Sequence, residues 1–130
     1  MSKLNEHACG MVARVESVNL NAVAATTLYT VPTAKIFVPH YLVIRELSDD
    51  AALTVATFGQ VGALTDFLGA QTLSGLDAAG AAGILMPVPN ATTVKITEYT
   101  AGEVFQIDVT TAAGAACTCT IEVFGTLMDA

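Results

Sequence analysis

Charged side chains are scarce in this sequence. Only 13% of the 130 residues are Asp, Glu, Lys or Arg, against about 25% in a typical soluble domain. Threonine fills many of the polar positions, and its β-branched side chain suits the pleated surface of a sheet. A surface that is poor in charge and rich in Thr and Ala is weakly protected against association. We therefore expect a β-sheet protein whose faces are largely covered by other copies of itself or by a larger partner.

Basic residues are the rarest charged group. Five Lys and Arg stand against twelve Asp and Glu, which gives a net charge of −7. A nucleic-acid-binding protein needs clustered Lys and Arg to displace counterions from phosphates, so the sequence argues against nucleic acid as a partner. An anionic membrane surface is disfavoured for the same reason. No apolar run reaches the roughly 18 residues of a membrane span, and residues 1–10 lack the apolar core of a signal peptide. We expect a chain that is made or assembled in a cytoplasm.

Groups that perform catalysis are few. The two histidines are His7 and His40, and a nucleophile needs a base and an orienting group beside it. His40 lies in an apolar stretch, where a packed or interface side chain is the more ordinary role. Asp108 and Glu122 are expected to point outward on neighbouring strands, yet without tryptophan there is no aromatic platform for a sugar, and we interpret them as solvated strand faces. The sequence therefore predicts no enzyme and no cofactor.

Three cysteines, an odd number, do not indicate a disulfide framework. Cys117 and Cys119 are expected on one face of a strand, where two side chains are poorly placed for an unstrained bridge. Together with His7 and Cys9 they would supply one nitrogen and three sulfurs, which is a possible zinc set if the N-terminal segment lies beside the last strand. Both spacings are tighter than in usual zinc fingers. Buried free thiols, with no metal, are the interpretation that we adopt.

Period-two alternation of apolar and polar residues is the main positive signal. We expect strands at residues 11–18, 26–31, 36–46, 53–58, 93–99, 104–110 and 117–124. The side chains expected to point inward in the last three are Val94, Ile96, Phe105, Ile107, Val109, Cys117, Cys119, Ile121 and Val123. Residues 63–83 are the least regular, and either a short helix over 63–68 or a long loop fits them. The pattern predicts an all-β fold, an antiparallel β-sandwich of jelly-roll-like type, with one domain over 11–130 and a flexible arm over 1–10.

The stretch from 36 to 44 is apolar at both alternating positions. A strand that is apolar on both faces is covered on both faces, and one of the covers can be another subunit. Phe37, His40, Tyr41 and Val43 are therefore candidate interface residues. Pro39 indicates a bulge or an edge position. An ordinary core strand remains the alternative.

Three segments resemble small virion proteins of tailed bacteriophages, especially capsid decoration (cement) proteins and tail accessory proteins. These are TLYTVP at 27–32, followed by AK at 34–35 and the long apolar strand; AGEVFQIDVT at 101–110; and CTIEVFGTL at 119–127. The resemblance implies a virion protein that binds the outside of a capsid shell as a homo-oligomer, with the major capsid protein and other copies of itself, in a dimer or trimer, as partners. It implies no catalytic residue, and residues 1–10 become a candidate tether to the shell. The alternative function is a tail or fibre accessory module that binds carbohydrate or a receptor.

Overall fold

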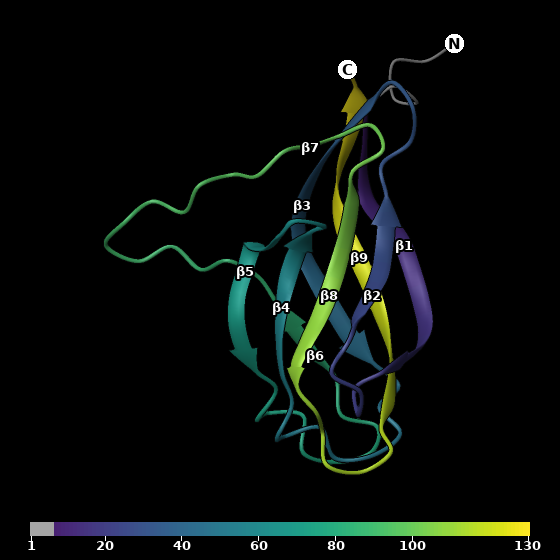
Figure 1. Cartoon of the computed structure of the whole chain (residues 1–130). Coiled ribbons are helices and arrows are strands. Elements are labelled where there is room, and N and C mark those ends of the chain that lie inside the picture. Colours follow the sequence, from purple (N-terminus) through teal and green to yellow (C-terminus); the bar gives the residue numbers. More distant parts are fainter. Residues whose placement is uncertain (1–6) are drawn as a thin grey trace.

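Nine strands in two antiparallel sheets form the fold (Figure 1), in a computed structural model that describes residues 7–130. The strands are β1 (His7–Asn19), β2 (Ala25–Thr30), β3 (Lys35–Arg45), β4 (Val55–Gln60), β5 (Ala63–Thr72), β6 (Gly83–Leu85), β7 (Tyr99–Thr100), β8 (Val104–Thr111) and β9 (Thr118–Asp129). The all-β sandwich expected from the alternation is confirmed. Over residues 7–130 no helix forms that could span a membrane.

The chain is wound as a jelly roll. Sheet A has the strand order β1-β9-β3-β6, with the short β7 also paired to β3, and sheet B has the order β2-β8-β4-β5. Strands pair from the ends of the chain inward: β1 with β9, β2 with β8, β3 with β6 and β4 with β5. This is a long hairpin folded over on itself, the arrangement of double-sheet jelly rolls. The jelly-roll expectation is therefore also confirmed.

Strand β1 begins earlier than expected. It pairs with β9 from His7 onward, in the register His7↔Met128. Residues 7–10, which were expected in the flexible arm, therefore lie in sheet A, because the long C-terminal strand supplies a partner for them. The rest of the expected arm, residues 1–6, lies outside the described residues.

Strand β5 corrects the expectation of a helix or loop over residues 63–72, whereas residues 73–82 form the expected loop. It pairs antiparallel with β4, with register shifts between Ala56 and Phe58 and between Phe58 and Gln60. Two consecutive side chains, Phe67 and Leu68, are both buried. The bulged pairing breaks the alternation from which a strand is recognised, so pairing with β4 decides the structure where the local pattern is weak.

The expected strand at 93–99 is also wrong in most of its length. Only Tyr99–Thr100 is paired, against Phe37 and Ile36 of β3. Val94 is half-buried, and Ile96, which was expected to point inward, has 72% of its surface exposed. Residues 86–98 instead leave the sandwich as a long projecting segment between β6 and β7 (Figure 1). The alternation is present here, but no sheet edge lies beside it.

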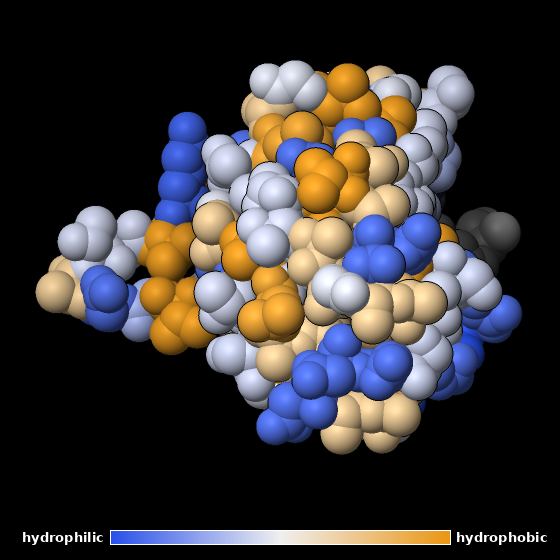
Figure 2. All heavy atoms as spheres, turned by 60° about the horizontal axis from the view of Figure 1, so that its bottom comes forward, coloured by the Kyte–Doolittle hydropathy of each residue, from blue (hydrophilic) through white to orange (hydrophobic). Residues whose placement is uncertain are grey.

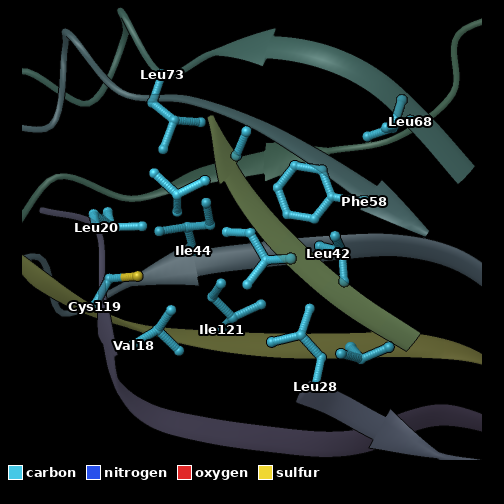
Figure 3. Packing of buried hydrophobic residues seen from close by; sticks show 14 of the residues in the cluster. Val18, Leu20, Leu28, Leu42, Ile44, Phe58, Leu68, Leu73, Cys119 and Ile121 are labelled. Atoms are coloured by element: carbon cyan, nitrogen blue, oxygen red, sulfur yellow. The ribbon is translucent and has the colours of Figure 1, made fainter. Parts of the chain in front are cut away.

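Side chains from both sheets fill the space between them. Figure 3 shows Leu42 and Ile44 of β3 and Ile121 of β9 lying near Phe58 of β4, and all four are fully buried. Every residue expected to point inward in β8 and β9 is buried, and the alternation in β8 is confirmed. In β9 the expectation of a solvated outer face is wrong at Thr120 and Glu122, which are also buried, because neighbouring side chains cover them. Burial of a large apolar side chain stabilises a fold by about 1.5–3 kcal/mol relative to its exposure.

An aromatic cluster closes the other end of the core. Phe105 of β8 packs against Phe67 and Tyr99, each with ring centroids 5.5 Å apart, and against Phe37 at 6.3 Å. These rings come from both sheets, so the cluster ties the two layers together where the projecting segment leaves the body. Tilted and edge-to-face pairs of this kind add about 0.5–1.5 kcal/mol each beyond area burial.

Candidate interaction surface

The outer face of sheet A is largely apolar at its centre. Cross-strand register places Met11 of β1, Phe124 of β9 and Tyr41 of β3 in one row. The Tyr41 and Phe124 rings stack with centroids 4.7 Å apart and an interplanar angle of 12°. Beside this row, Val43 pairs with Ile84 of β6. We call these five residues face A; Met11 is 51% exposed, Ile84 is 57% exposed, and the other three are half-buried.

The outer face of sheet B is polar by comparison. Asp108 of β8 lies between Ala25 and Thr57, and Gln106 lies between Thr27 and Gly59. A face of this composition is stable in water, whereas face A leaves aromatic and aliphatic carbon exposed. Contiguous exposed apolar surface of this kind marks interaction sites. Face A is therefore the candidate interaction surface of the sandwich.

An ion-pair cluster borders face A at one end. The Glu122 carboxylate accepts a hydrogen bond from Arg14 Nη1 at 2.8 Å and lies 2.9 Å from Arg45 Nε. Arg14 Nη2 also donates to Glu46 Oε1 at 2.7 Å, and the Thr120 hydroxyl donates to Glu46 Oε2 at 3.0 Å. The side chain of Glu122 is only 10% exposed because the two guanidiniums cover it.

This arrangement changes the acid–base properties of its members. Hydrogen bonds from Arg14 and then from Thr120 lower the pKa of Glu46 below its ordinary value. Hydrogen bonds to Glu46 and then to Glu122 raise the pKa of Arg14. Both groups therefore stay charged at neutral pH, so the ion pair between Arg14 and Glu46 persists there.

The sequence-predicted interface residues separate into two groups. Phe37 is fully buried in the aromatic cluster, so for this side chain the ordinary core role is correct. Tyr41 and Val43 lie in face A. His40 is exposed, and its Nε2 lies 3.0 Å from the Thr126 hydroxyl oxygen. The register of β3 against β9 shifts between Pro39 and Tyr41, which is the bulge that Pro39 indicated. This shift turns Tyr41 and Val43 outward.

The projecting segment, residues 86–98, is not predicted by the sequence analysis. The segment follows β6. Because Ile84 of β6 pairs with Val43 of β3, the segment begins at face A. Its far end is held by Asp66 of β5, whose carboxylate accepts a hydrogen bond from the Tyr99 hydroxyl at 2.5 Å and whose carbonyl accepts one from the Thr97 hydroxyl at 2.9 Å. Burial, and then the bond to Asp66, raise the pKa of Tyr99, so this anchor stays protonated.

The two ends of the segment meet over a pocket of about 260 Å³. Its lining comprises His40, Phe67, Pro87, Val94, Lys95, Ile96 and Thr97. The sequence signal for a projection was present, since Pro87, Pro89 and Asn90 are residues that interrupt strands. The alternation of residues 93–99 is the stronger local pattern, and it predicts a strand where the structure has a projecting segment.

The possible zinc set is not assembled. Cys9 pairs with Thr126 and Cys119 with Val18 in the β1–β9 ladder, so the two cysteines lie about 24 Å apart at roughly 3.4 Å per residue. His7 is in the same strand as Cys9, and its side chain is not described. Among the described residues no cluster of three His, Cys, Asp or Glu forms that could hold a metal. Cys117 and Cys119 are buried free thiols, as the adopted interpretation had it.

The carboxylate pair considered for sugar chemistry is not a pair. Asp108 lies in sheet B and Glu122 in sheet A, so the two residues are on opposite layers of the sandwich rather than on neighbouring strands. Tyr99, one of the three tyrosines available for a sugar platform, is fully buried. The second pocket, of about 250 Å³, is lined mostly by aliphatic and small residues from Ile44 to Leu85.

The strand order and pairing define the class of this protein, a double-sheet jelly roll, an architecture found in viral capsid and lectin domains. Within that class, the chain is similar to a chain of the solved structure described as the cyanophage Pam1 capsid asymmetric unit. The match has a TM-score of 0.53 and 17% sequence identity, and it covers 93% of this chain and 83% of that one. At this identity the likeness concerns the fold. No protein-family model and no curated protein matches the sequence.

Proposed function

We propose that this chain is a structural virion protein that decorates the outer surface of a phage capsid shell and stabilises it as a homo-oligomer. The observation that carries the proposal is the similarity of fold, over 93% of the chain, to a chain of a cyanophage capsid. The segments at 27–32, 101–110 and 119–127 resemble decoration proteins independently of that comparison.

The surface supports the same role. A protein that works alone in solution keeps exposed apolar patches small and surrounds them with charge. Here charge is sparse, face A is apolar, and eight large apolar side chains have 44% or more of their surface exposed. Many repeated contacts of modest size then give strong attachment to a symmetric shell. Binding to the assembled shell in preference to its free subunits would stabilise the assembled state by mass action.

Co-sedimentation with empty shells of the parent phage tests the proposal. We expect the purified chain to pellet with expanded shells at a fixed number of copies per capsomer and to raise the temperature at which the shells come apart. Bovine serum albumin at equal concentration serves as the control for trapping. A chain that stays in the supernatant at every concentration contradicts the proposal.

Glycan-array binding tests the alternative, a tail or fibre module that recognises carbohydrate or a receptor. The jelly roll is shared with lectins, and the half-buried, stacked rings of Tyr41 and Phe124 on face A are the aromatic pair that a sugar could contact. Saturable glycan binding without shell binding would favour that alternative over decoration.

A further inference from the structure

The segment at 86–98 gathers exposed apolar side chains to an unusual degree. Eight large hydrophobic residues are strongly exposed over the described chain, and three of them lie in this segment. These are Met86 at 44%, Val88 at 71% and Ile96 at 72%, and Ile84 of β6, at 57%, lies just before it. The segment is about a tenth of the sequence, so exposed apolar side chains are concentrated in it and at its start. Figure 2 shows the segment as a projection at the left, with hydrophobic atoms gathered at its base.

The segment is held at its two ends and is extended between them. Its start is fixed by the pairing of β6 with β3, and its end by the contacts of Thr97 and Tyr99 with Asp66. Pro87 and Pro89 restrict the backbone near the first end, since proline fixes φ. No strand pairing forms along residues 86–98, so the segment can pair with another chain, although the Thr92 amide already donates to Asn90 Oδ1. A projection that is fixed at its base loses less entropy on binding than a free tail.

We propose that residues 86–98 form an arm that binds face A of a second copy of this chain. The inference rests on the proposed function only for its setting, because it concerns how copies join rather than what they decorate. Continuity of surface supports a second copy as the occupant: Ile84 belongs to face A and lies two residues from Met86 of the arm. A partner that covers only the arm, or only face A, leaves the other apolar surface exposed to water. Each copy supplies one arm and one face, so reciprocal or ring-like exchange covers both at once.

Charge complementarity supports the same occupant. The arm carries two charged residues, Lys95 beside the exposed Ile96 and Glu98 beside the anchored Tyr99, so Lys95 is the charge in its more distal part. The ion-pair cluster beside face A contains the carboxylates of Glu16, Glu46 and Glu122 against the guanidiniums of Arg14 and Arg45. The cluster therefore carries a net negative charge, which attracts the Lys95 ammonium of the arm.

The experiment measures solution mass by light scattering over a range of concentrations. We expect the wild-type chain to be a discrete oligomer and the double variant Val88→Ser/Ile96→Ser to fall to the mass of a single chain or to dissociate at least tenfold more readily. The matched control is Val23→Ser/Leu53→Ser, because these side chains are 67% and 70% exposed in other loops. This control should keep the wild-type mass. Circular dichroism and the melting temperature check that all variants are folded.

A second pair of variants tests the receiving surface. Met11→Lys, in face A, should weaken the oligomer as the arm variant does, whereas Val61→Lys, at a residue 59% exposed outside face A, should not. Lys95→Glu should also weaken it, and more strongly at low salt. A wild-type chain that is monomeric throughout, or an oligomer whose mass the arm variant leaves unchanged, overturns the inference. Loss of the oligomer in the arm variant but not in Met11→Lys overturns face A as the receiving site.

Shell binding separates this inference from the proposed function. An oligomer that depends on the arm but does not bind shells leaves the inference standing and removes the decoration role. Shell binding by a monomeric chain whose arm variant no longer binds shells assigns the arm to the shell and overturns the inference.

Discussion

Glu122 is a buried carboxylate whose position depends on two arginines. Its side chain is 10% exposed and contacts Arg14 and Arg45. We expect Glu122→Ala to lower the free energy of unfolding by about 1.5–3 kcal/mol, because hydrogen bonds to charged groups are lost and two guanidiniums lose a partner. Chemical denaturation measures the change. Asp77→Asn, at an exposed position, is the control and should stay within about 0.5 kcal/mol of wild type; equal effects of the two substitutions would contradict the role given to Glu122.

Glu46 gives the same network a dependence on pH. Because the bond from Arg14 lowers its pKa in the folded state below the ordinary 4.5, its charged form stabilises the fold above that value, and the contribution is lost as the pH falls through the lowered pKa. Glu46→Gln should therefore melt at a lower temperature than wild type at neutral pH and at the same temperature well below the pKa. Melting curves across the acid range test this. A difference that is the same at both ends of the range would argue against it.

The three thiols differ in accessibility. Burial, and then the neighbouring Cys117, raise the pKa of Cys119 to about 12, so its reactive thiolate is scarce at neutral pH. Cys9 is exposed, and Cys117 is buried with its thiol donating to the Asp49 carbonyl at 3.4 Å. Iodoacetamide should modify one site per native chain, at Cys9, and three after unfolding in guanidinium. Mass spectrometry counts the labels, and rapid native labelling of Cys119 would refute the buried position.

At the scale of elements, the β3–β9 ladder requires a glycine. A Cβ on Gly125 would lie 2.3 Å from the Val38 carbonyl oxygen and 2.6 Å from a Phe37 ring carbon. Gly125→Ala should destabilise the protein by about 3 kcal/mol, at the upper end of overpacking costs, because backbone must move. Gly69→Ala in β5 meets nothing within 4 Å and should change stability by less than about 0.5 kcal/mol. Thermal unfolding of the two variants measures the change in stability, and a similar loss in both would contradict the close approach of β3 to Gly125.

The bulge in β3 has a consequence beyond its own strand. Phe37 points into the core before it, and Tyr41 and Val43 point to face A after it. One inserted residue thus lets a single strand contribute both to the aromatic cluster and to the interaction surface. A straight strand with the same sequence would have exposed a different set of side chains.

At the scale of the whole molecule, pairing from the ends inward sets how fast the chain folds. β1 must find β9, which lies more than 95 residues further along the chain, and such long-range pairings slow folding. We expect refolding in the range of milliseconds to seconds or slower. Stopped-flow circular dichroism after dilution from urea measures it, and the arm variant Val88→Ser/Ile96→Ser should refold at the wild-type rate, since the arm lies outside the sandwich. Complete refolding within microseconds would contradict this view.

The sequence by itself determined the class of fold and the inward faces of β8 and β9. In those strands the alternation is local, and each position carries its own evidence of burial: Phe105, Ile107, Ile121 and Val123 all lie in the core. Scarce charge likewise predicts surfaces that other chains cover, and that part stays a prediction. Both inferences depend on side-chain type alone, which a sequence states directly.

Only the tertiary structure decided which segments found partners. Residues 63–72 became a strand because β4 lies beside them, and residues 93–98 did not because no edge does. Glu122 is buried because arginines from β1 and β3 cover it, and Phe37 belongs to the core because a bulge reverses the faces of β3 after it. Pairing and coverage are contacts between residues far apart in the chain, so no local pattern contains them.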